Sequence, residues 1–113
     1  MIINSPHPFP IYVSQRSAKN MWQDYRVFPD RVELRSWILL RTLVIPAEDI
    51  VDVEVESPGP FNSKHWYAVK IDWADFFSHV EIHRKSGLLK HIKFTPDNPA
   101  HFVATCKSIM KPS

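Results

Sequence analysis

The stretch Asp97-Asn98-Pro99-Ala100-His101-Phe102-Val103-Ala104-Thr105-Cys106-Lys107-Ser108-Ile109-Met110 decides the fold of this chain. Read as a helix of about 3.6 residues per turn, it gathers its apolar side chains on one stripe. That stripe consists of Phe102, Val103, Cys106, Ile109 and Met110. A single apolar helix face must be buried against another layer. We therefore expect a curved sheet or open barrel to close over one C-terminal helix, capped by Asp97 or Asn98 with Pro99 in its first turn.

The chain before this helix predicts β-strands at regular spacing, which is typical of an all-β domain. Seven antiparallel strands are expected: Met21–Phe28, Arg31–Trp37, Arg41–Ile45, Ile50–Glu56, His65–Trp73, Phe76–Arg84, and a last strand from Leu88 that Pro96 ends. Pro58-Gly59-Pro60 is the strongest internal break, and we interpret it as a connection between two sheets.

Alternation within the strands predicts which side chains face the core. The inward set is Val51, Val53, Val55, Tyr67, Val69, Ile71, Trp73, Phe76, Val80 and Ile82. Acidic residues from Asp49 to Glu56 then form the wet face of the fourth strand, and Asp72 points outward from the next one. A Lys85–Gly87 hairpin loop, with Gly87 at positive φ, pairs Ile82 with Lys90 and sets Glu81 beside His91.

Composition indicates one globular domain. The chain has 113 residues, 44% hydrophobic and 23% charged, and its net charge of +2 gives no argument for nucleic-acid binding. Three alternate prolines make residues 1–20 an extended N-terminal arm, which leaves 21–111 as the domain. The single cysteine, Cys106, reads as a small buried hydrophobe. With no leader and no apolar tract long enough to span a bilayer, we expect a cytoplasmic protein.

Three segments resemble a known family. Tyr25-Arg26-Val27-Phe28 leads into Arg31–Ser36, Ile45-Pro46-Ala47-Glu48-Asp49-Ile50 precedes the valine strand, and Phe94–Pro99 leads into the helix. Together they resemble the small bacterial pleckstrin-homology-like (PH-like) domains, including those of unknown function, over roughly residues 21 to 110. The resemblance implies a PH-like barrel or sandwich, with two near-orthogonal sheets of four and three strands and a helix plugging one corner. It also implies frequent homo-oligomerisation through sheet edges.

Eukaryotic relatives of this family bind phosphoinositides through basic residues on a long loop between the first two strands. Here that loop is only Pro29-Asp30, flanked by Arg26 and Arg31, with no lysine cluster. A multiply charged headgroup needs several converging cations. We therefore expect no phosphoinositide specificity.

A metal site is a weaker hypothesis. His79 and His83 on one strand are about 13 Å apart, too far to share an ion, so a two-strand site would use Glu81, His83 and His91. The alternative is a solvated face with a Glu81–His91 cross-strand pair. The chain shows no glycine-rich phosphate loop and no nucleophile elbow, so we expect neither cofactor nor enzymatic activity.

Trp37-Ile38-Leu39-Leu40 is the most informative irregularity, because it falls at the tip of the hairpin between the second and third strands. An apolar tip either folds over the end of the core or forms an exposed patch, flanked here by Arg35 and Arg41. We predict a non-catalytic interaction module that forms homo-oligomers or binds another protein through this tip. A membrane-surface adaptor that binds anionic lipid through the same tip, and a small-ligand carrier, are the alternatives. Leu39→Asp is predicted to weaken self-association without unfolding.

Overall fold

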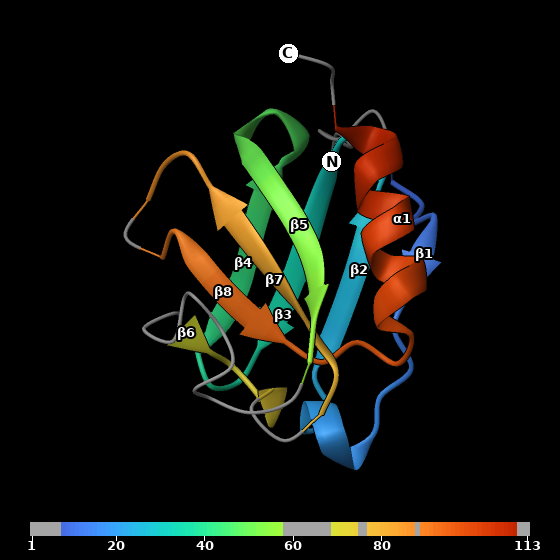
Figure 1. Cartoon of the computed structure of the whole chain (residues 1–113), viewed down its shortest axis with the longest axis vertical. Helices are drawn as coiled ribbons and strands as arrows, with labels where there is room; N and C mark the ends of the chain where they lie inside the picture. Colours follow the sequence, from blue (N-terminus) through green and yellow to red (C-terminus); the bar gives the residue numbers. More distant parts are fainter. Residues whose placement is uncertain (1–7, 58–68, 75–76, 88, 111–113) are drawn as a thin grey trace, which may run out of the picture.

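The computed structural model describes residues 8–57, 69–74, 77–87 and 89–110 as two packed sheets and one helix (Figure 1). The first sheet has the strand order β1 (Tyr12–Val13), β2 (Asp24–Phe28), β3 (Arg31–Ser36), β4 (Arg41–Pro46). The second has the order β5 (Ile50–Glu56), β7 (His79–Arg84), β8 (His91–Phe94), β6 (Val69–Lys70). Two short 3-10 turns, η1 (Ala18–Asn20) and η2 (Ala47–Asp49), and helix α1 (Pro99–Ile109) complete these elements.

The mostly β, sandwich-like architecture with one C-terminal helix agrees with the sequence prediction. Apolar side chains from the inner faces of both sheets share one core with α1, which contacts β5, β2 and β7. Three details differ. The described residues form eight strands instead of seven, the two sheets do not close into a barrel, and β6 runs parallel to β8.

Helix α1 is placed as predicted. Phe102, Cys106 and Ile109 are buried in the core. Asn98 is the N-cap, and its side chain accepts the backbone N–H of His101 at 3.1 Å. Burial raises the pKa of the Cys106 thiol to about 12, so this cysteine behaves as a small apolar side chain.

The N-terminal segment belongs to the domain from Ile11 onward. Tyr12 of β1 pairs with Val27 of β2, and its ring packs edge-on against Phe102 at 5.4 Å. The boundary predicted at residue 21 therefore cuts through the first sheet. Residues 1–7 lie outside the described residues.

The predicted strand register is wrong by two residues in the β7–β8 hairpin. Ile82 pairs with Ile92 instead of Lys90, and the Arg84 N–H donates to the Lys90 carbonyl at 2.7 Å. The loop is therefore longer than three residues. Because a shift of two keeps every side chain on its face, Ile92 and Phe94 still point into the core. Gly87 takes a positive φ of 87°, as expected.

The predicted strand 65–73 is short where it is described. After Lys70 the chain leaves the sheet: Ile71 is buried as predicted, but Trp73 is 49% exposed. Asp72 accepts the Tyr25 hydroxyl at 2.7 Å instead of pointing freely outward. Tyr67, Phe76, Leu88 and the break at 58–60 lie outside the described residues.

The valines of β5 do not all reach the core. Val53 is buried, whereas Val51 and Val55 are 44% and 45% exposed. The β5–β7 register shifts between Ile50 and Asp52, and β5 is an edge strand. The irregularity lies beside Val51 and accounts for its exposure. Val55 lies in the regular part of the ladder, near the end of an edge strand, where alternation alone does not ensure burial.

No helix in the described part of the chain combines the length and apolarity that crossing a membrane requires.

Candidate functional site

The hairpin tip between β3 and β4, residues 37–40, is exposed. Trp37 is 56%, Ile38 43% and Leu40 88% accessible to solvent. Leu39 differs, because it is partly buried and packs against the core. Of the two explanations for this apolar segment, the exposed patch therefore holds for three of its four residues.

The backbone at this end of the molecule is strained. Leu40 has a φ of 58°, and Met21 and Trp22 have φ values of 58° and 56°. These are the only described residues other than glycine with positive φ. They lie together, since the Trp37 indole N–H donates to the Met21 carbonyl at 3.0 Å. A left-handed conformation costs an L-residue about 1–2 kcal/mol.

We call this end the lower end, after its place in Figure 1, and define it as residues 17–23, 36–41, 71–74 and 77. Besides the hairpin tip it exposes Trp22, Trp73 and Phe77, at 65%, 49% and 43%. The arginines that flank the tip, Arg35 and Arg41, are also exposed, and neither forms an ion pair with a described carboxylate. The lower end therefore combines apolar area, cationic charge and backbone strain.

The outer edge of β4 is open in the described structure. The Ala47 N–H donates to the Asp30 carbonyl at 2.9 Å, which makes these residues a hydrogen-bonded pair at the end of the β3–β4 ladder. Antiparallel pairs alternate, so Thr42, Val44 and Pro46 turn their backbone groups away from β3. Pro46, which lacks an N–H, sits where that group would face the open edge, as expected of an edge proline.

A groove of about 470 Å³ lies beside the far end of the same edge. It is lined by Pro29, Asp30, Arg31, Val44, Pro46, Ala47, Glu48 and Ile109. Val44 is 46% exposed, and Glu48 is exposed as well. This strand edge thus carries an apolar knob, Leu40, at one end and a groove at the other.

The hypothetical metal residues lie in a buried ionic cluster on the outer face of the second sheet. His91 Nδ1 lies 2.8 Å from Glu81 Oε2, so the predicted cross-strand pair is present. The His83 and His91 rings stack, with centroids 4.2 Å apart. However, His79, Glu81 and Lys93 are buried, and the prediction that this face is solvated is wrong for them.

Lys93 and Glu56 explain the cluster better than a metal does. The ammonium of Lys93 lies 3.1 Å from Glu56 Oε1, and His79 Nε2 lies 3.2 Å from the same oxygen. Desolvation favours a raised pKa of Glu56. Hydrogen bonds shared with Glu81, Lys93 and His79, together with the positive charge of Lys93, outweigh desolvation and lower the pKa of Glu56 to about 2.

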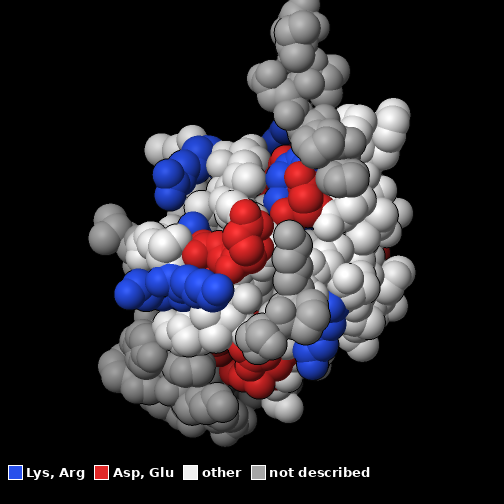
Figure 2. Space-filling view, turned by 90° about the horizontal axis from the view of Figure 1, so that it is seen from above, with Lys and Arg blue, Asp and Glu red and all other residues white. Residues whose placement is uncertain are grey.

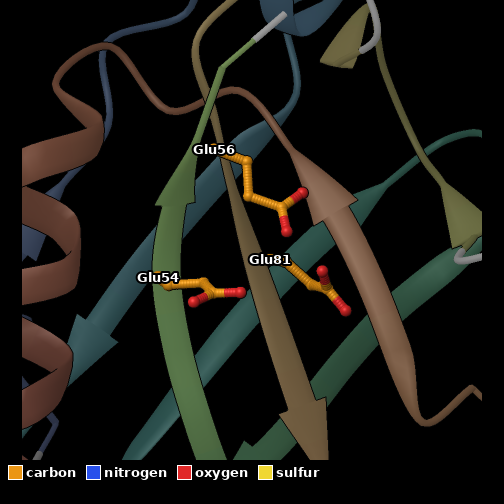
Figure 3. Close-up of side chains that lie close together, drawn as sticks. All are labelled: Glu54, Glu56 and Glu81. Carbon is orange, nitrogen blue, oxygen red and sulfur yellow. The ribbon is translucent and has the colours of Figure 1, made fainter. Parts of the chain in front are cut away.

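Figure 3 shows the carboxylates of Glu54, Glu56 and Glu81 on one face of β5 and β7, where their oxygens lie within 4.8 Å of one another. Three acidic groups at this spacing resemble a cation site. The Lys93 ammonium lies 3.1 Å from Glu56, so one of the three carboxylates already has a cationic partner within the protein. Alternation alone had put Lys93 and Glu81 on one face; it could not show that this face is buried.

The opposite end, seen from above in Figure 2, carries basic and acidic side chains side by side. We call it the upper end and define it as the turn 29–30, η2, residues 85–87 and Leu89. Arg31 contacts Asp30 and Glu33 at 2.8 and 2.7 Å, and Arg84 contacts Asp49 at 3.1 Å. Charges paired in this way leave no large surface of one sign on the described part of this end.

Comparison with protein-family models, curated proteins and solved structures finds no match to this chain.

Proposed function

We propose that this chain is a non-catalytic, PH-like interaction module that self-associates by pairing the β4 edges of two copies. The chain order supports the PH-like part: strands of two packed sheets are followed by one helix that packs into the core. The proposed interaction rests on one observation, the exposed side chain and left-handed backbone of Leu40.

Leu40 is unfavourable twice over in an isolated chain. Its side chain is 88% exposed, and its backbone occupies the left-handed region. Glycine or asparagine would fit this turn without either disadvantage. Strain of this kind at an exposed position is typical of a functional contact. A binding partner that covers the side chain accounts for both features.

Pairing β4 with its own copy satisfies the open edge. A two-fold axis at Val44 sets Val44 opposite Val44, and Thr42 opposite Pro46 of the other copy. This register forms four backbone hydrogen bonds, because Pro46 can only accept. It also brings Leu40 opposite Glu48 of the other copy, next to the groove, with Arg41 close to the same carboxylate. The tip of each copy therefore faces the groove and Glu48 of the other copy. This contact occurs twice, as an isologous interface requires.

The other sheet edges are less suited to this contact. β1 is two residues long, the described part of β6 is also two residues long, and β5 packs against α1. β4 has six residues, and no described strand pairs with its outer side. Edge pairing with flanking side-chain pockets is a common mode of recognition.

The test is sedimentation velocity on the wild type, Val44→Lys and Val13→Lys. Both valines are 46% exposed on opposite edges of one sheet, which makes them a matched pair. Val44→Lys sets two like charges against each other across the two-fold axis, so we expect monomers. Val13→Lys is expected to associate like the wild type. A monomeric wild type, or equal effects of the two substitutions, would end the proposal.

A substitution at Leu40 tests the tip better than Leu39→Asp. Leu39 packs against the core, so Leu39→Asp would confound unfolding with loss of association. Leu40→Asp adds the same charge at a position with no core contact to lose. We expect it to keep the circular-dichroism spectrum of the wild type, and to melt no lower than the wild type at concentrations where both are monomers, while at higher concentration its sedimentation coefficient falls to that of the monomer.

A further inference from the structure

An apolar pocket at the lower end is not used by the proposed self-association. It has a volume of about 430 Å³ and is lined by Ala18, Lys19, Trp73 and Phe77; we call it the Trp73 pocket. This volume lies in the range of small-molecule sites. The backbone N–H of Trp73 donates to the Lys19 carbonyl at 3.4 Å, which connects the segment that carries this aromatic wall to the η1 turn.

Lys19 is the only charged residue among the described lining of this pocket. Its ammonium contacts the backbone carbonyl of Asp97 at 3.4 Å, and no described carboxylate pairs with it. The Asp97 carboxylate accepts the hydroxyl of Tyr12, and no ion pair between it and Lys19 is formed. Lys19, whose ammonium pairs with no described carboxylate, therefore lines an apolar hollow together with Trp73 and Phe77.

We propose that the Trp73 pocket binds a small amphiphilic carboxylate. An alkyl chain or aromatic ring of about ten carbons packs against the indole of Trp73 and the ring of Phe77. The carboxylate pairs with the Lys19 ammonium, which keeps the charged head at the solvent side. The apolar walls select for the chain, and the lysine selects for the sign of the head.

This assignment stands independently of β4 pairing, because none of the described lining residues belongs to β4 or to the hairpin tip. A chain that does not self-associate could still bind the ligand in this pocket. A chain that binds no ligand could still self-associate through β4. An anionic bilayer could offer the same combination of apolar chain and negative head, so the experiment must separate a dissolved ligand from a membrane.

The experiment is a titration of the whole chain with monomeric decanoate, followed by backbone and indole N–H chemical shifts. We expect a dissociation constant on the order of 1 mM for a ligand of this size, with the shifts concentrated at Ala18, Lys19 and Trp73. Decanol should bind more weakly and decyltrimethylammonium weaker still. Equal binding of all three, or shifts scattered away from the pocket, would overturn the proposal.

Variants separate the two halves of the site. Lys19→Met should weaken decanoate about threefold and leave decanol unchanged, as expected for one exposed ion pair. Trp73→Ala should weaken both ligands about tenfold. Trp22→Ala is the control, because Trp22 is exposed but does not line the pocket. Binding to vesicles of phosphatidylcholine and phosphatidylglycerol without any binding of decanoate would show membrane docking and refute a ligand pocket.

Discussion

The upper and lower ends of the sandwich close their turns with different chemistry. At the upper end Gly87 takes the positive φ, and Asp49 accepts the Ser86 N–H and hydroxyl at 3.1 and 2.8 Å. At the lower end Met21, Trp22 and Leu40 take positive φ. The upper turns are built from residues that suit their conformations, whereas the lower turns are built from large apolar residues that do not.

This difference indicates where the chain is shaped by something other than its own stability. Ion pairs and a glycine hold the upper end without exposed aromatic area on its described residues. The lower end holds strained backbone together with exposed Trp22, Trp37 and Leu40. Strain and exposed apolar area both lower the stability of an isolated domain, so their coincidence favours binding surfaces at this end.

The largest expected effect is at the upper end. Asp49→Ala removes a carboxylate that accepts from Arg84 and Ser86 and is itself almost buried. Hydrogen bonds to a charged group contribute about 1.5–3 kcal/mol, so we expect the free energy of unfolding to fall by about 2–3 kcal/mol in urea denaturation. Asp52→Ala, at an exposed position on β5, is the control and should change it far less. Equal losses would mean that Asp49 does not anchor this end.

Acid should weaken the upper end through the same carboxylate. Burial favours a raised pKa of Asp49, but the Ser86 hydroxyl and the Arg84 guanidinium outweigh it and hold the pKa below 3.8. A pKa lower in the folded than in the unfolded state adds stability that is fully present above the unfolded value and is lost as pH falls through the folded one. Unfolding free energies from pH 7 to 3 should therefore fall less in Asp49→Asn than in the wild type, because the variant has no carboxylate to protonate at this position. Parallel profiles would contradict this assignment.

Sequence patterns could identify the elements of both ends but not the environment of every side chain. The amphipathic stripe placed α1, and alternation placed β3 and β5 and the Glu81–His91 pair, because these features depend on local periodicity. Burial of Lys93 depends on what covers its face, which no local pattern encodes. The β7–β8 register escaped prediction because a shift of two preserves the same alternation.

The lower end was recognised in part. The run of four apolar residues at a hairpin tip indicated a surface, and three of them are exposed. The exposure of Trp22 was not predicted, and Trp73 was assigned to the inward-facing set, because aromatic residues in predicted strands are ordinarily core residues. The position of Trp73 depends on tertiary contacts, such as the hydrogen bond from its backbone N–H to the Lys19 carbonyl. The signal that could have found Trp22 is its position just after a polar turn, outside the regular alternation.

Gly87→Ala should destabilise the upper end by about 1 kcal/mol. The backbone φ of 87° disfavours any side chain, and a Cβ there would lie 3.2 Å from Arg84 Nη2. Gly87→Asn is the informative companion, because asparagine tolerates the left-handed region better than alanine does, and it should lose less. Thermal unfolding of both variants measures this order. A loss from alanine no greater than that from asparagine would show that φ is not what selects glycine here.

The smallest effect has the opposite sign and falls at the lower end. Leu40→Asn relieves the left-handed leucine, so we expect the isolated domain to gain about 0.5 kcal/mol in unfolding free energy while self-association weakens. Ile38→Asn is the matched control, because it removes apolar area from the same tip at an ordinary φ and should bring no gain. Denaturation must be measured at a concentration where sedimentation shows monomers, since association itself would stabilise the wild type. If Leu40→Asn lowers stability as Ile38→Asn does, Leu40 supports the fold itself, and the contrast between the two ends no longer points to a binding surface.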